Sequence, residues 1–134
     1  MLVTYTPEDG DRQTWEFNPG RVRQSETEII EKRYGKTYEA FKEGVTSGDS
    51  RARRVLLWHL LRRDHHTLRF EDTPDFFMDE LVVEYSRDEM LDLRDRIVKA
   101  NLPEDERTDI LAALDLELGD VVDGEGKAVA PSGA

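Results

Sequence analysis

The sequence predicts a mainly α-helical protein with about five helices, an N-terminal β-hairpin and a disordered acidic C-terminal tail. Apolar residues recur with helical spacing over most of the chain after residue 21. Before that point, two short β-type runs flank a turn. The length of 134 residues suits one domain of ordinary size. We therefore expect a hairpin over 1–20, a helical domain over 21–118 and a flexible tail over 119–134.

The first twenty residues have the composition of two strands joined by a turn. Leu2 to Thr6 and Thr14 to Phe17 are rich in β-branched and aromatic residues, and Pro7 to Asp11 is a turn-type cluster. An isolated two-stranded ribbon is only marginally stable in water. The hairpin should therefore pack on helices or join another sheet.

Two helices are predicted next. Helical spacing begins at Arg21, and Gly35 suits the C-cap of the first helix. The second helix ends before Ser47 to Ser50, a stretch that can supply the next N-cap. The spacing is carried by Val22, Ile29 and Ile30 in the first helix, and by Tyr38, Phe41 and Val45 in the second.

A third helix, over about Arg51 to Arg63, is apolar around most of its circumference. Such a helix is either central in the fold or shared with a partner, and in a small domain both can hold. Its apolar residues are Ala52, Val55, Leu56, Leu57, Trp58, Leu60 and Leu61.

The segment from Asp64 to Met78 is predicted to be mainly a loop, anchored by Leu68 and Phe70. The run over 80–85 fits either a short strand or the start of a helix, and the sequence does not separate the two.

Two more helices are predicted after residue 85. Ser86 and Glu89 form a capping box that opens a helix to about Ala100. Pro103 suits the first turn of the last helix. The apolar stripe of the first is broad, with Met90, Leu91, Leu93, Ile97 and Val98, and that of the second has Ile110, Leu111 and Leu114.

Charge is negative overall and unevenly distributed. The chain has 30 acidic and 19 basic residues, a net charge of −11 that argues against nucleic-acid binding. The third helix carries a basic charge pole without any acid, whereas segment 71–95 has ten acids against two arginines, or −8. The acidic segment can fold over the basic helix, or opposite poles can drive head-to-tail self-association that weakens in high salt. The pole consists of Arg51, Arg53, Arg54, Arg62 and Arg63.

Several classes of function are excluded or disfavoured. The absence of cysteine excludes disulfides, iron–sulfur clusters and thiol nucleophiles. No apolar run is long enough to span a membrane, and no secretory signal is evident. His59, His65 and His66 lack the i, i+4 spacing of a helical metal pair. We therefore expect no enzyme activity, cofactor or metal; a bacterial enzyme or regulator acting through His65 and Asp72 is a minor alternative.

Segment Arg51 to Phe76 combines an arginine-flanked apolar helix centred on Leu-Leu-Trp, a following Arg-Arg pair and then Leu-x-Phe-x-Asp. This pattern resembles the tail assembly chaperones of long-tailed, siphovirus-type bacteriophages, especially phages that infect actinobacteria. The resemblance covers about Thr37 to Leu114. Its motif consists of core residues.

The resemblance implies a small, acidic, helical and non-enzymatic protein of the host cell cytoplasm that is absent from the mature virion. Such chaperones bind the tape measure protein, keep it soluble and help recruit tail tube subunits. A longer form commonly arises by programmed frameshifting near the 3′ end of the gene. Gly126 and Lys127 would fit a slippery GGG-AAA site, with the tail serving as a tether.

A chaperone of this kind needs an apolar groove for a helical client. The candidate residues for client binding or self-association are Tyr38, Phe41, Val55, Trp58, Leu61, Met90 and Ile97. Plain core packing is the alternative for each of them. The alternative function is a structural virion protein of the tail or head–tail connector, which would be present in purified particles.

Overall fold

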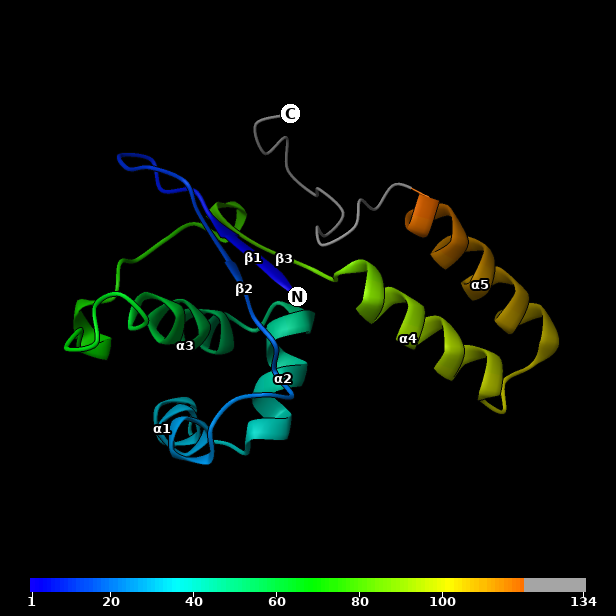
Figure 1. Cartoon of the computed structure of the whole chain (residues 1–134), viewed down its shortest axis with the longest axis horizontal. Coiled ribbons are helices and arrows are strands. Elements are labelled where there is room, and N and C mark those ends of the chain that lie inside the picture. The colour runs from blue at the N-terminus through cyan, green and yellow to red at the C-terminus, as the bar shows by residue number, and fades with distance from the viewer. Residues whose placement is uncertain (120–134) are drawn as a thin grey trace. The chain divides into compact units, whose positions relative to one another are not determined.

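The computed structural model describes residues 1–119, with five α-helices and one three-stranded sheet (Figure 1). The predicted mainly α fold with an N-terminal hairpin is therefore confirmed. The predicted tail lies outside the described residues, as do Gly126 and Lys127, except that Gly119 is the last residue of helix α5.

The chain forms two compact units. One comprises Val3–Val83, and the other comprises Met1, Leu2 and the chain from Glu84 onward. This division falls inside the stretch 21–118 that the sequence predicted as one helical domain. Its physical basis is that the last two helices pack against each other, whereas the first three pack among themselves.

The sheet has the strand order β2-β1-β3, with β1 at Leu2–Tyr5, β2 at Gln13–Glu16 and β3 at Leu81–Glu84. The predicted hairpin is confirmed, and the ambiguous run over 80–85 is a strand. The backbone N–H of Thr6 donates to the Glu80 carbonyl at 2.8 Å beside this third strand. The hairpin thus joins another sheet strand, as an otherwise marginal ribbon requires.

Helices α1 (Gln24–Tyr34) and α2 (Tyr38–Ser47) each end at a glycine in the left-handed region. Gly35 has φ 84°, which confirms the predicted C-cap, and Gly48 has φ 86°. Helix α1 begins three residues later than Arg21, because a turn with an Arg21 N–H to Asn18 carbonyl bond precedes it.

Helix α3 (Ser50–Leu61) is the centre of the Val3–Val83 unit and packs against α1 and α2. The Asp49 carboxylate caps it by accepting the Ala52 N–H at 3.0 Å. All seven apolar residues that the sequence places around the circumference of this helix are buried. Gly44 of α2 permits the close approach of α3, since a Cβ there would lie 2.8 Å from the Ala52 Cβ.

The chain between α3 and β3 is irregular apart from two short 3-10 turns, η1 at Phe70–Asp72 and η2 at Met78–Glu80. The predicted loop over 64–78 is therefore correct for most of its length. The anchors Leu68 and Phe70 are half-buried.

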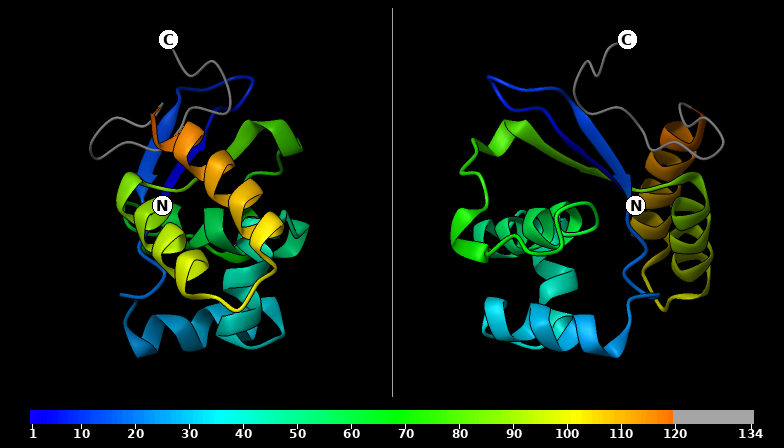
Figure 2. Two further views of the ribbon diagram at one scale, coloured as in Figure 1. Left: turned by 90° about the vertical axis from the view of Figure 1, so that its right-hand side faces the viewer. Right: turned by 60° about the vertical axis from the view of Figure 1, so that its left-hand side comes forward.

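The second unit is built on the antiparallel pair α4 (Arg87–Lys99) and α5 (Glu104–Gly119), which lie side by side in both views of Figure 2. The predicted capping box of Ser86 and Glu89 opens α4. Helix α5 starts directly after Pro103, one residue later than expected. Within residues 1–119, no helix has the length and apolarity needed to cross a bilayer.

Candidate functional site

Most of the predicted client-binding residues lie in the interior of the Val3–Val83 unit. Phe41, Val55, Trp58 and Leu61 are buried. Tyr38 is half-buried, its hydroxyl donates to the Pro19 carbonyl at 2.7 Å, and its ring stacks on Phe41. Burial, with a smaller contribution from Glu39, raises the pKa of Tyr38 to about 12. In this conformation these side chains form core rather than an open groove.

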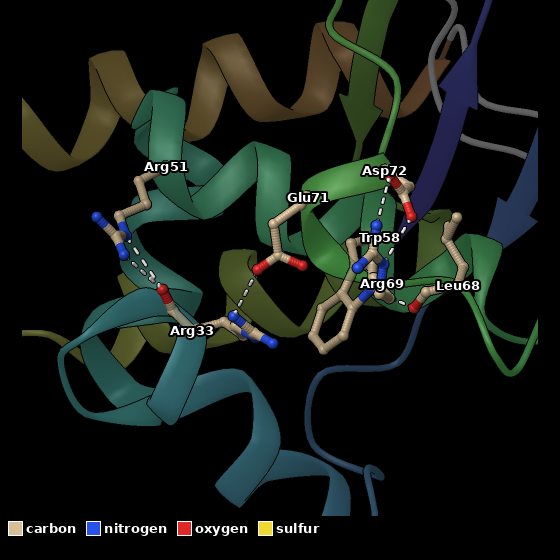
Figure 3. A network of polar contacts seen from close by, with 7 residues as sticks. All are labelled: Arg33, Arg51, Trp58, Leu68, Arg69, Glu71 and Asp72. Carbon is tan, nitrogen blue, oxygen red and sulfur yellow. Dashed lines mark hydrogen bonds and ion pairs between the residues drawn. The ribbon is translucent and has the colours of Figure 1, made fainter.

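Trp58 organises the segment that follows α3. Its indole Nε1–H donates to the Leu68 carbonyl at 2.9 Å (Figure 3). Phe70 packs edge-to-face on the indole at 5.7 Å, and the Arg62 guanidinium lies 4.7 Å from the indole centroid. The residues that carry the sequence resemblance therefore contact one another. Their contacts give them a structural role in holding the loop against α3.

The arginines of the basic pole contact backbone carbonyls. Arg51 donates from Nε and Nη2 to the Arg33 carbonyl, at 3.1 and 2.9 Å (Figure 3). Arg53 donates to the Val45 carbonyl at 3.1 Å. Carbonyl oxygens carry only partial charge, so these contacts join α3 to α1 and α2 without needing an acidic partner.

Two further arginines of the pole lie against rings or a nearby carboxylate. The Arg54 guanidinium lies 5.1 Å from the Phe70 centroid. Arg62 lies 3.6 Å from the Glu26 carboxylate. Within residues 1–119, none of the five pole arginines forms an ion pair with a carboxylate of segment 71–95. These contacts are intramolecular. Arg53 also donates to the backbone carbonyl of Leu81, which lies in segment 71–95, at 3.4 Å. Head-to-tail association stays a prediction.

His59 is the one histidine built into this unit's interior. Its side chain is 11% exposed, and Nδ1 lies 3.6 Å from the Glu26 carboxylate. Burial lowers the pKa of His59, Glu26 opposes that shift, and Arg63 and Arg62 add to it. Arg63 itself donates to the Glu16 carbonyl at 2.9 Å.

The other two histidines, His65 and His66, are exposed. Among the described residues, no group of three or more His, Asp or Glu side chains could hold a metal ion. The minor alternative of an enzyme or regulator that acts through His65 and Asp72 stays a prediction. Asp72 pairs with Arg69 at 2.9 Å (Figure 3), which lowers the pKa of Asp72.

Exposed large apolar side chains gather in the unit from Glu84 onward. Of the seven within the described residues, five belong to that unit and none lies on α1, α2 or α3. The five are Tyr85, Leu91, Val98, Ile110 and Leu116, and the other two, Phe77 and Met78, lie in the loop before β3.

The α4–α5 pair buries few of its own apolar residues. Met90 and Leu118 are the buried apolar side chains among the described residues of these helices. Ile97 is half-buried, and Leu91 and Val98 are 43% and 45% exposed. Because Leu91 and Val98 are seven residues apart, they lie on one side of α4. Of the predicted client-binding residues, only Met90 and Ile97 belong to this pair.

The polar contacts of α4 and α5 join the two helices beside the apolar stripe. Arg94 of α4 pairs with Asp115 of α5 at 2.7 Å, which lowers the pKa of the Asp115 carboxyl. The i, i+4 pairs Lys99–Asp95 and Arg96–Asp92 lie along the exposed side of α4. Charged side chains thus lie on the same helices as the exposed apolar residues.

Comparisons with protein families, with curated proteins and with solved structures find no match to this chain. The sequence indicated Met90 and Ile97 as candidates but neither Leu91 nor Val98, and the only signal for these two was the breadth of the apolar stripe of α4.

Proposed function

We propose that the protein is a bacteriophage tail assembly chaperone that binds an apolar helical segment of the tape measure protein and keeps it soluble. The observation that carries this proposal is the set of exposed apolar side chains on α4 and α5, namely Leu91, Val98, Ile110 and Leu116. The resemblance of segment 51–76 to such chaperones supplies the identity of the client.

The physics of a helix pair supports a third helix as the occupant. Among the described residues of the two helices, Met90 and Leu118 are buried, whereas Leu91, Val98, Ile110 and Leu116 keep between 38% and 74% of their surface exposed. Full burial of an exposed Leu or Val side chain contributes about 1.5–3 kcal/mol, and covering the exposed part of Leu91 or Val98 contributes a fraction of that. An amphipathic client helix laid along α4, about 20 Å long, would cover Leu91 and Val98 together.

The charge of the chain supports the solubilising part of the role. The net charge of −11 favours colloidal solubility, since like-charged complexes repel one another. The recruitment of tail tube subunits, through a possible longer form, belongs to the same proposal and rests on the resemblance alone.

The test is co-expression with the tape measure protein encoded in the same genome. We expect the wild-type chain to raise the soluble fraction of the client and to co-purify with it. The double variant Leu91→Ser and Val98→Ser should lose both effects. Met78→Ser is the matched control, because Met78 is 81% exposed but lies in the other unit. Equal activity of the double variant would contradict the assignment to α4.

Purified phage particles distinguish the chaperone from the alternative. A chaperone acts during assembly, so mass spectrometry should find the tape measure protein and not this chain in mature particles. Stoichiometric presence of this chain would instead identify a structural virion protein.

A further inference from the structure

A second surface lies in the Val3–Val83 unit, where the end of β1 meets the loop that leads into η2. A pocket of about 380 Å³ opens there. Three aromatic rings line it, from Tyr5, Phe76 and Phe77. The Tyr5 and Phe76 rings meet at an interplanar angle of 67° with centroids 6.0 Å apart. Phe77 is 65% exposed, so its ring is accessible to a ligand.

The same pocket is lined by four carboxylates, and no lysine or arginine of residues 1–119 lines it. Asp75 and Glu80 hold the loop, since they accept the backbone N–H groups of Phe76 and Phe77 at 3.0 and 2.7 Å. The other two carboxylates, of Glu8 and Asp9, complete the lining from the β1–β2 turn.

Neither turn carboxylate is neutralised by a neighbour. Among the described residues, Glu8 and Asp9 have no ion-pair or hydrogen-bond partner. A pocket with aromatic walls and uncompensated negative charge favours a cation, because ring faces and carboxylates both attract positive charge.

We propose that this pocket binds an arginine side chain of a partner polypeptide. A guanidinium is planar and weakly hydrated, so it stacks on rings while pairing with carboxylates. A divalent metal is a poorer fit, since no described cluster of His, Asp and Glu has metal-binding geometry. The inference rests on this pocket alone and is independent of the chaperone proposal, which concerns α4 and α5.

The test uses the full ¹⁵N-labelled chain, titrated with N-acetyl-arginine-N-methylamide and, separately, with its citrulline analogue. Citrulline has nearly the same shape without the charge. We expect amide shifts at Asp9, Phe76 and Phe77 with the arginine compound only, with half-saturation on the order of millimolar for a single side chain.

Two variants and a control identify the pocket. Phe77→Ala should weaken arginine binding about fivefold through loss of one ring, and Asp9→Asn should weaken it by a similar factor through loss of one charge. Met78→Ala should leave binding unchanged, since Met78 is exposed next to the pocket without lining it. The amide shifts of residues outside the pocket report whether each variant is folded. If Phe77→Ala does not fold, the test rests on Asp9→Asn alone.

Three outcomes would overturn the proposal. The arginine and citrulline compounds could shift the same amides equally, which would exclude recognition of charge. Both pocket variants could bind arginine as well as the wild-type chain does. The pocket amides could also shift on dilution of the protein itself, which would make a second copy of this chain the occupant.

Discussion

Single residues in this protein have contacts that their type alone does not reveal. Gly44 lies in the interior of α2, where glycine is less favourable than alanine for the helix. At this position the side chain of Ala52 in α3 and the hydroxyl of Tyr34 in α1 lie so close to the backbone of α2 that only a hydrogen atom fits in place of a Cβ. That hydroxyl is itself fixed by donating to Asp49 at 3.1 Å.

We therefore expect Gly44→Ala to destabilise the Val3–Val83 unit by about 1 kcal/mol or more. The new Cβ would lie 2.8 Å from the Ala52 Cβ and 2.9 Å from the Tyr34 Oη. This overlap outweighs the gain in helix propensity of about 1 kcal/mol. Urea unfolding followed by tryptophan fluorescence measures the change.

Gly20→Ala is the matched control, since its Cβ would lie 3.6 Å from the Asn18 side chain, an ordinary contact. A Gly44→Ala variant as stable as this control would contradict the close approach of α2 and α3.

His59 makes stability depend on pH. Because burial holds the folded-state pKa of His59 below the unfolded value of about 6.5, the unfolded chain binds a proton that the folded chain does not. Stability should therefore fall as pH drops below about 6.5 toward the folded-state pKa, and it should be constant above.

Urea midpoints at several pH values between about 5 and 7.5 measure this dependence. His59→Gln should flatten the curve in that window, whereas His65→Gln, at an exposed position, should retain it. Identical curves for the wild-type chain and His59→Gln would show that another group is responsible.

At the scale of elements, the capping box of Ser86 and Glu89 defines where α4 begins. The Ser86 hydroxyl accepts the Glu89 N–H at 3.2 Å, and the Glu89 carboxylate accepts the Ser86 N–H at 3.0 Å. Both bonds satisfy N–H groups that the first turn of α4 cannot pair internally.

Ser86→Ala should destabilise α4 by about 1 kcal/mol. Hydrogen exchange of the first-turn amides of α4 should accelerate accordingly, about fivefold for 1 kcal/mol. Ser50→Ala is the control, because α3 is capped by Asp49 and not by Ser50. Unchanged exchange in the Ser86 variant would mean that the capping box contributes nothing to α4.

The sequence predicted the helices and strands better than it predicted the residues of the candidate site. The five helices, the hairpin and the capping box follow from local rules of spacing and turn chemistry. The third strand and the exposed α4 stripe depend on long-range packing. Val55 and Leu91 are both apolar residues at helical spacing, yet one is fully buried and the other 43% exposed. Only the number of neighbours around each helix separates them.

The acidic aromatic pocket could not be predicted from the sequence for a related reason. Glu8 and Phe77 are far apart in sequence, and they line the same pocket only because Thr6 and Glu80 pair beside the sheet. The role of the arginine pole was also hidden, because backbone carbonyl acceptors leave no trace in the sequence.

At the scale of the whole molecule, the two units differ in how much apolar area they bury. Val3–Val83 contains the buried residues of α1, α2 and α3, whereas α4 and α5 bury Met90 and Leu118. Since stability follows buried apolar area, the unit from Glu84 onward should open at a lower free energy.

Both tryptophans, Trp15 and Trp58, lie in the Val3–Val83 unit, so their fluorescence reports on that unit alone. Helical circular dichroism reports on all five helices. We expect the circular dichroism signal to begin falling at lower urea than the fluorescence signal, since non-coincident transitions indicate separate unfolding. Coincident transitions would show one cooperative body.

The carbonyl contacts of the α3 arginines have a consequence for how this sequence can drift over evolution. A carbonyl acceptor belongs to the backbone, so positions 33 and 45 keep theirs whatever residue replaces Arg33 or Val45. The donor residue cannot vary in the same way, because a lysine at position 51 could not reproduce the contact that two nitrogens of Arg51 make. In related sequences, we therefore expect Arg51 and Arg53 to be more strongly conserved than the residues at positions 33 and 45, whose carbonyls they contact.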